Sequence, residues 1–168
     1  MTYYKLTDQN MQAYNSCQWE IGVWKEATGN PLQDLCSDAW LHCYDSPLVA
    51  ILHNPVHVDI GNPRLFEVEV AGETKNDNGM KRGFRRMRLV KELSTPVITT
   101  IQRAAYGILC AKQVCTDPGF AIWADRWLSG ENRAAWAAWA AAETARAAAE
   151  ISNTVDFVKL ANTAMEVE

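Results

Sequence analysis

The sequence lacks the features that mark several common classes of protein. No apolar run approaches the roughly 20 residues that a membrane-spanning helix requires, so we expect no transmembrane segment. The first residues show no basic start followed by an apolar stretch, so we expect no signal peptide. The chain also has no glycine-rich phosphate-binding loop and no serine in a sharp, glycine-flanked turn. These absences weigh against membrane proteins, P-loop nucleotidases and serine hydrolases.

Cysteine and histidine are present without the spacing of a disulfide framework or a metal motif. The 5 cysteines are odd in number and scattered, which favours reduced thiols in a cytoplasmic protein. The best zinc candidates are Cys36, Cys43, His53 and His57. However, the two cysteines are 7 positions apart, and Pro55 interrupts the helix that would align the two histidines. We therefore expect no metal and no cofactor.

Charge is nearly balanced, apart from one basic segment. The 168 residues carry a net charge of −4, which fits neither a strongly basic nucleic-acid binder nor a strongly acidic mimic of DNA. The basic segment contains Lys81, Arg82, Arg85, Arg86, Arg88 and Lys91. Three of its members, Arg82, Arg85 and Arg86, are candidates for contact with a partner. Nucleic acid is the less favoured ligand for them.

Periodicity predicts an α+β fold with two regions. Alternating apolar residues predict strands over residues 2–6, 18–25, 64–71 and 84–93. The last two strands are expected to pair antiparallel, with Glu67 and Glu69 opposite Arg86 and Arg88. Helical signals predict a helix from Pro47 to Asn54-Pro55, and others over 96–115, 118–128, 131–150 and 155–165. We therefore expect a small, largely antiparallel sheet in residues 1–94 and three or four helices in residues 95–168.

Residues 131–150 form the most unusual segment of the chain. Eleven of these 20 residues are alanine, the strongest helix former. Trp136 and Trp139 lie three positions apart, on one face of the predicted helix. Small side chains let another backbone approach closely, so we expect a docking surface that serves self-association or a partner. The alternative within a monomer is that the two tryptophans close this helix back onto helix 96–115.

Five short segments carry a recognisable pattern. They are WEIGVW at 19–24, LCSDAWLH at 35–42, SPL at 46–48, RLFEVEVAGE at 64–73 and RLVKEL at 88–93. Together they resemble a family from tailed bacteriophages and prophages, in which such a module precedes a helical, often alanine-rich tail. The resemblance covers residues 1–128 and carries no assigned activity. It implies an accessory protein that works in the cytoplasm of a bacterial host.

A second resemblance concerns the order of the predicted elements. A strand, a loop, the Leu41-His42 segment, a short helix and the strand over 64–71 follow one another as in the ADP-ribosyltransferase fold. In that fold a histidine or arginine near the first strands holds the dinucleotide, and a later glutamate acts on the ribose. The resemblance implies His42 for the first role, with Glu69 or Glu92 for the second.

These observations lead to one hypothesis and two alternatives. Because no catalytic motif is evident, we expect a non-enzymatic phage protein that binds and inhibits a host protein, as anti-CRISPR and other counter-defence proteins do. The candidate contact residues are Trp136, Trp139, Arg82, Arg85 and Arg86. The first alternative is an NAD-using enzyme of the ADP-ribosyltransferase type. The second is a nucleic-acid-binding protein that uses the basic segment, an alternative that the negative net charge weakens.

Overall fold

The computed structural model describes residues 1–133 and 155–168, which belong to two compact units. The first unit spans Met1–Pro96 and the second Val97–Glu168. The first contains a five-stranded antiparallel sheet and an α-helix, whereas the described elements of the second are helices. The predicted α+β fold is therefore confirmed. Most of the alanine-rich segment, including Trp136 and Trp139, lies outside the described residues, so its docking role stays a prediction.

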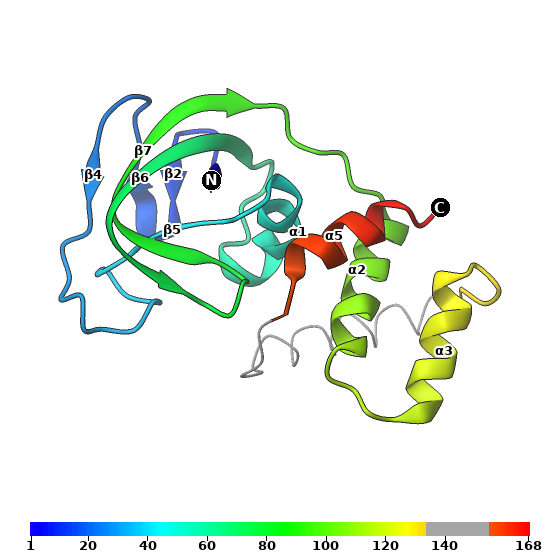
Figure 1. Cartoon of the computed structure of the whole chain (residues 1–168). Coiled ribbons are helices and arrows are strands. Elements are labelled where there is room, and N and C mark those ends of the chain that lie inside the picture. The colour runs from blue at the N-terminus through cyan, green and yellow to red at the C-terminus, as the bar shows by residue number, and fades with distance from the viewer. Residues whose placement is uncertain (134–154) are drawn as a thin grey trace. The chain divides into compact units, whose positions relative to one another are not determined.

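A long, curved β-hairpin dominates the first unit (Figure 1). Its strands are β6 (Arg64–Asn76) and β7 (Arg82–Leu93), which pair antiparallel. β1 (Tyr3–Thr7) pairs with the other side of β6, whereas β5 (Leu41–Cys43) and β4 (Lys25–Glu26) pair with different parts of β7. Three of the four predicted strands are thereby confirmed, because their apolar residues alternate with a period of two.

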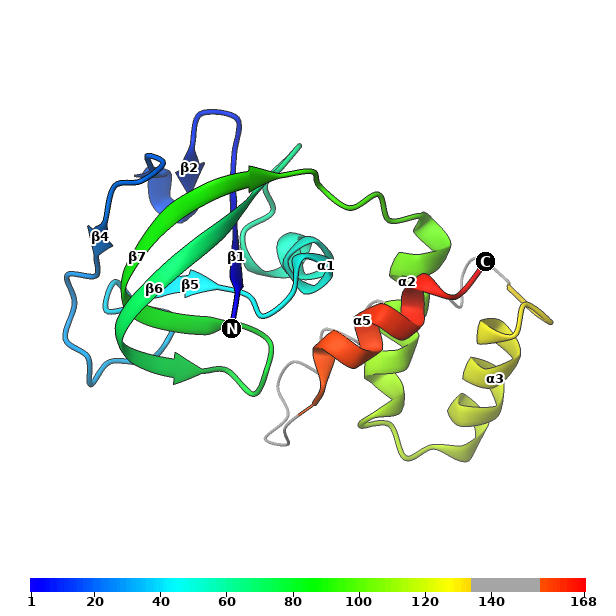
Figure 2. The ribbon, with the colours of Figure 1, turned by 45° about the horizontal axis from the view of Figure 1, so that its top comes forward.

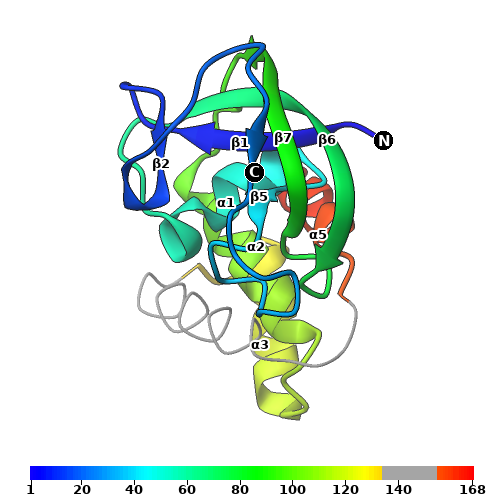
Figure 3. The same cartoon turned by 90° about the vertical axis from the view of Figure 1, so that its left-hand side faces the viewer.

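The sheet closes on itself into a small barrel. Directly after β5, Tyr44 pairs with Tyr4 of β1, and the two residues exchange backbone hydrogen bonds of 2.8 and 2.9 Å. The strand circuit therefore runs β1-β6-β7-β5 and back to β1. Figure 3 shows β1 running crosswise to β7, as strand twist and closure require in a small barrel.

The barrel encloses a hydrophobic core and carries a helix on one outer side. The buried residues of the core are Trp19, Leu41, Cys43, Phe66, Val68, Phe84, Met87 and Leu89. Helix α1 (Pro47–His57) lies beside β1 (Figure 2). Because side chains alternate along a strand, β1 can contribute to the core with one face and meet α1 with the other. Leu6 of β1 and Val49 of α1 are accordingly buried.

Helix α1 begins as predicted and ends later than predicted. Pro47 occupies its first turn, which suits a residue that lacks a backbone N–H. Pro55 lies inside the helix, which continues to His57 and ends with the Val58 N–H donating to the Asn54 carbonyl at 3.0 Å. The predicted end at Asn54-Pro55 is therefore wrong, because the helix continues past Pro55 in spite of the one hydrogen bond that this residue cannot donate.

The predicted strand over residues 18–25 is also wrong. Only its two ends are extended, as the close of β3 (Cys17–Gln18) and the start of β4. Between them Gly22 adopts a left-handed backbone conformation, with φ at +81°, which breaks the extended path. The intervening loop nevertheless follows the edge of β7, since the Gly22 N–H donates to the Leu89 carbonyl at 2.8 Å.

Helices make up the described part of the second unit. They are α2 (Thr100–Lys112), α3 (Pro118–Leu128) and α5 (Phe157–Met165). Helix α3 begins at Pro118 as predicted, with Asp117 as its cap, whereas α2 begins 4 residues later than predicted, at a capping box formed by Thr99 and Gln102. The predicted start at Thr95-Pro96 is wrong because this box satisfies the first N–H groups instead. Within the described ranges, no helix has the length and apolar character needed to cross a bilayer.

Candidate functional site

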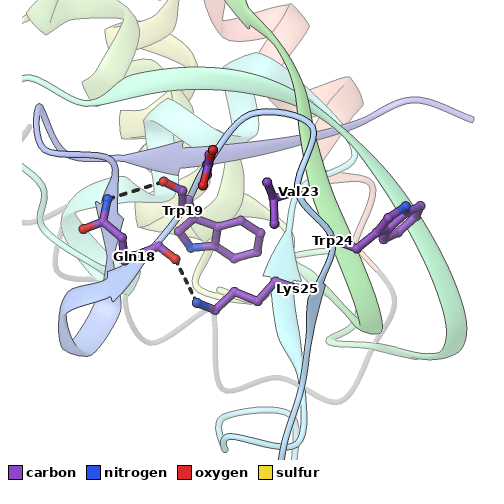
Figure 4. Close-up of a pocket in the computed structure, with 6 residues that line it drawn as sticks. Gln18, Trp19, Val23, Trp24 and Lys25 are labelled. Carbon is purple, nitrogen blue, oxygen red and sulfur yellow. Dashed lines mark hydrogen bonds between the residues drawn. The ribbon is translucent and has the colours of Figure 1, made fainter.

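An aromatic and basic surface lies where the loop before β4 meets β7. The ring centroid of Trp24 lies 5.0 Å from the guanidinium carbons of both Arg86 and Arg88. Ile21 and Val23 of the same loop are 47% and 50% exposed. We refer to these five residues as the Trp24 surface. It groups an aromatic side chain with two cations that it contacts, and it includes two exposed aliphatic residues of the same loop. Figure 4 shows that the Val23 side chain points to the Trp19 side of this loop and the Trp24 side chain to the other.

Carboxylates hold both arginines of the Trp24 surface in place. Arg86 pairs with Glu26 of β4 at 3.0 Å, and Arg88 donates to Glu69 of β6 at 2.7 Å. The Glu69–Arg88 pair follows the predicted cross-strand register, whereas Arg86 lies opposite Ala71. Each guanidinium therefore contacts both a carboxylate and the Trp24 indole. Because these side chains are already ordered, they lose less conformational entropy when a partner binds.

A shallow pocket of about 190 Å³ opens beside the Trp24 surface (Figure 4). Its lining residues are Gln18, Trp19, Glu20, Val23, Trp24 and Lys25. Trp19 is only 4% exposed, and its indole Nε1 meets no acceptor within the described chain. The ammonium groups of Lys5 and Lys25 lie 4.6 and 5.6 Å from the centroid of this indole. The pocket thus combines a buried hydrogen-bond donor with two nearby positive charges.

Lys5 brings one of these charges against Trp19 from β1. The residue is 7% exposed, and its ammonium donates to the His42 carbonyl at 2.8 Å. Burial, which disfavours the charged form, lowers the pKa of Lys5 to about 8. The ammonium form therefore still predominates at pH 7. Among the described residues, Lys5 forms no ion pair that would cancel its charge.

The other two arginines predicted as contacts serve the fold. Arg82 pairs with Asp45 at 2.6 Å, and both side chains are largely buried. Arg85 donates to three backbone carbonyls of the preceding loop, those of Ala27, Gly29 and Ala39. Arg85 thereby fixes the course of that loop over β7. Of the three arginines, only Arg86 belongs to the Trp24 surface.

The histidines are enclosed by the first unit. His42 Nε2 lies 2.5 Å from the Leu35 carbonyl, and the Tyr44 hydroxyl lies 3.0 Å from His57 Nδ1. The rings of His53 and His57 meet edge to face, with their centroids 5.2 Å apart. Burial lowers the pKa of His42 and of His53 to about 4 and that of His57 to about 3. All three imidazoles are therefore neutral at pH 7.

The zinc candidates are not arranged as a ligand set. In residues 1–133 and 155–168, no group of three or more His, Cys, Asp or Glu side chains could hold an ion. Cys36 is exposed, and its sulfur accepts a hydrogen bond from the Lys81 ammonium at 3.1 Å. Cys43 is buried in the barrel core, where desolvation raises the pKa of its thiol to about 12. The two thiols therefore occupy unlike surroundings.

The residues implied by the ADP-ribosyltransferase resemblance lie at separate places along β7. His42 is opposite Gly83, whereas Glu69 is opposite Arg88. Five positions of extended strand separate these two points, which is roughly 17 Å. Glu92 lies still further along β7 and forms an ion pair of its own. The described structure does not gather these groups into one site.

Comparison with known proteins identifies the first unit. A family model described as a domain of unknown function, DUF7666, matches residues 1–101, which is more than half of the chain. The chain belongs to this family. No curated protein and no solved structure matches it. The DUF7666 domain contains the closed barrel and α1, and with them the Trp24 surface, the pocket and the three histidines.

Of the two arginines of the Trp24 surface, sequence reasoning named only Arg86 as a contact residue, and it missed Arg88 and the aromatic site. Neither Trp19 nor Trp24 was singled out, although both lie in the WEIGVW segment. The available signal was the break in alternation at Trp24. Positions 19 and 24 are odd and even, so they cannot share one face of a regular strand. Either one of the two indoles had to lie outside the core or the segment had to bend.

Proposed function

We propose that the protein is a non-enzymatic binding protein that docks onto a host protein through the Trp24 surface. The observation that carries the proposal is the contact of Trp24 with two guanidinium groups that carboxylates already hold. Tryptophan and arginine are enriched among the residues that dominate the energy of protein interfaces. An ordered aromatic side chain also loses little conformational entropy on binding.

The surroundings of Trp24 suit a protein better than a nucleic acid. Ile21 and Val23, in the same loop as Trp24, add exposed aliphatic area. Such an apolar centre with polar groups at its edge is the usual composition of a protein interface. A nucleic-acid backbone would be attracted by cations that lack carboxylate partners. Arg86 and Arg88 both have such partners.

The titratable groups favour binding over catalysis. A general acid or base works best when its pKa lies near the operating pH and a substrate can reach it. The pKa values of the three histidines lie near 3 or 4, and Lys5 is enclosed by the fold. None of these groups combines a suitable pKa with exposure. The non-enzymatic proposal rests on this combination.

The resemblance to proteins of tailed bacteriophages suggests the kind of partner. We propose that the partner is a protein of the bacterial cytoplasm and that the bound protein blocks a working surface of it. A counter-defence role of the anti-CRISPR kind is the specific form of this proposal. Occupying a surface needs only affinity and shape, which agrees with a site built from an aromatic centre and paired charges.

Affinity capture with the full chain tests the proposal. Tagged wild-type, Trp24→Ala and Leu32→Ala proteins are incubated with lysate of a bacterium that hosts tailed phages. Stoichiometric partners are identified by mass spectrometry and purified, and their affinities are measured by calorimetry. Trp24→Ala should weaken the affinity about thirtyfold, the equivalent of a hot spot of about 2 kcal/mol.

Leu32→Ala is the matched control, because Leu32 is a large apolar residue that is 88% exposed and lies outside the Trp24 surface. Its affinity should equal that of the wild type. A partner that binds Trp24→Ala as tightly as wild type would contradict the assignment of the surface. The absence of any stoichiometric partner would contradict the binding role itself.

A further inference from the structure

The pocket beside the Trp24 surface has a chemistry of its own. We propose that it takes the carboxylate of an aspartate or glutamate side chain, supplied by the partner whose existence the proposed function assumes. The pocket of about 190 Å³ has room for a small acidic group, not for a nucleotide. Its six lining residues come from one continuous stretch, from Gln18 to Lys25.

The first argument is the indole N–H of Trp19. The residue is 4% exposed, and Nε1 is without an acceptor in the described part of the chain. A buried donor without an acceptor is costly, so native proteins usually supply one. Figure 4 shows that the edge of the ring carrying the nitrogen lies on the side of the Lys25 ammonium. The nitrogen has less than 1 Å² of exposed surface, so an oxygen that enters beside Lys25 would meet both donors once the Lys25 side chain moves aside.

The second argument is the sign of the local charge. Lys5 and Lys25 both lie within 6 Å of the Trp19 ring centroid, at 4.6 and 5.6 Å. Each ammonium donates to a backbone carbonyl, that of His42 or that of Gln18, at 2.8 Å. Neither forms an ion pair with any described residue. A carboxylate would provide the missing negative charge and accept from Lys25 and Trp19 together.

Glu20 is the one acidic residue in the lining, and it opposes an incoming carboxylate. The lining has one carboxylate, that of Glu20, and one ammonium, that of Lys25, and the buried Lys5 ammonium against the Trp19 ring makes the local charge positive. Glu20 also offers a sharp test, since removing its charge should improve the binding of an anion and weaken the binding of a cation. The sign of that single change reports the charge of the natural occupant.

The apolar rim indicates that the carboxylate comes from a side chain and not from a chain terminus. Val23 and Trp24 line the pocket and also belong to the Trp24 surface. Figure 4 shows their side chains on opposite sides of the loop, so a partner that contacts both would continue past the pocket. An acidic side chain in the middle of such a surface can enter the pocket while its neighbours cover Trp24.

Nuclear magnetic resonance of the full chain tests this inference with free probes. The chain has 7 tryptophans, and the indole N–H signal of Trp19 is assigned through its contacts with the side chains of Lys5 and Lys25. N-acetyl-glutamate N-methylamide is titrated to high millimolar concentration, and the matching glutamine compound is the neutral control. The glutamate probe should shift the Trp19 signal to saturation, and the glutamine probe should leave it in place.

Two surface variants give the charge test. Lys25→Gln should weaken the glutamate probe about fivefold, the range expected for one exposed charge. Glu20→Gln should strengthen it about twofold for the same reason. A Trp19 signal that does not move, or that moves equally with both probes, would overturn the inference. Weaker binding to Glu20→Gln would show that the pocket prefers a cation, and tighter binding of N-acetyl-alanine would assign it to a chain terminus.

The free probes need no host partner, so this test and the capture experiment can fail separately. If the Trp19 N–H signal does not shift with the probe but capture of a partner depends on Trp24, only the proposal of a carboxylate pocket is refuted. Probe binding without any captured partner would remove the proposed function and leave the pocket as an anion site.

Discussion

Lowering the pH from 7 to 5 should destabilise the DUF7666 domain and leave the helices of the second unit almost unaffected. An unfolded histidine has a pKa near 6.5, whereas burial lowers the values of His42 and His53 to about 4 and that of His57 to about 3. Below pH 6.5 the unfolded state therefore binds protons that the folded state excludes. The stabilisation is complete above pH 6.5 and is lost as the pH falls toward 4 and 3.

The magnitude follows from proton linkage. Each histidine removes about 1.4 kcal/mol of unfolding free energy per pH unit below 6.5. From pH 6.5 to 5 this amounts to about 2 kcal/mol for each histidine and about 6 kcal/mol for the three together. The contact between His53 and His57 couples their protonation, so the sum is an upper figure. A whole domain is stabilised by only about 5–15 kcal/mol, so unfolding near pH 4 to 5 is expected.

Hydrogen exchange read by mass spectrometry gives the comparison within one molecule. All 3 histidines lie in the first unit, and the second unit contains none. Peptides from β6 and β7 should lose protection between pH 7 and 5, after correction for the intrinsic pH dependence of exchange, while peptides from α2 should not.

His42→Gln provides the matched variant, because glutamine can still donate to the Leu35 carbonyl but does not titrate. It should reduce the pH slope by about one third. Equal protection of β6 and β7 at pH 7 and 5 would refute the reasoning, since it would mean that the imidazoles take up protons in the folded state.

Two further predictions concern the loop that crosses β7. Arg85→Leu leaves three backbone carbonyls without their donor and should cost about 2–3 kcal/mol, measured by urea denaturation against Arg86→Leu, whose guanidinium is exposed. Gly83→Ala places a methyl group 2.3 Å from Leu35 Cδ1 and 2.8 Å from Trp40 Cβ, so it should cost about 1–3 kcal/mol. Gly61→Ala, which meets nothing within 4 Å, is its control in the same thermal melts. A glycine variant pair with equal melting temperatures would contradict the close packing of this loop.

The correct part of the fold prediction came from two signals, the alternation of apolar and polar residues in strands and the capping residues of helices. In β6 and β7 the apolar residues alternate over many positions, and the cross-strand pair of Glu69 with Arg88 followed from them. The second expected match failed, since Glu67 lies opposite Lys91. In an antiparallel pair, Glu69 opposite Arg88 directs Glu67 toward Val90 and away from Arg86, and the bulge after Glu67 shifts the register by one more position. Local signals predict elements well, but they do not contain the bulges that set register.

The candidate site was beyond sequence reasoning because it depends on contacts between distant segments. Trp19 is flanked by Lys5 from β1 and Lys25 from β4, and nothing local in the sequence links these lysines. For the same reason, the adjacent residues Arg85 and Arg86 differ in their contacts. Arg85 turns to backbone carbonyls of a loop some 46 to 58 positions away, whereas Arg86 reaches the surface. In the sequence, the one indication of that difference was that successive side chains of β7 point to opposite faces of the strand.

The junction of Tyr4 with Tyr44 also governs the order in which the domain can be assembled. The first strand leaves the ribosome before either of its neighbours, because its full-length partner begins at Arg64. During synthesis β1 must therefore wait, with its backbone groups unpaired, until the hairpin of β6 and β7 has been made. Such dependence on distant pairing slows folding, and it leaves the backbone groups of β1 open to incorrect pairing in the meantime.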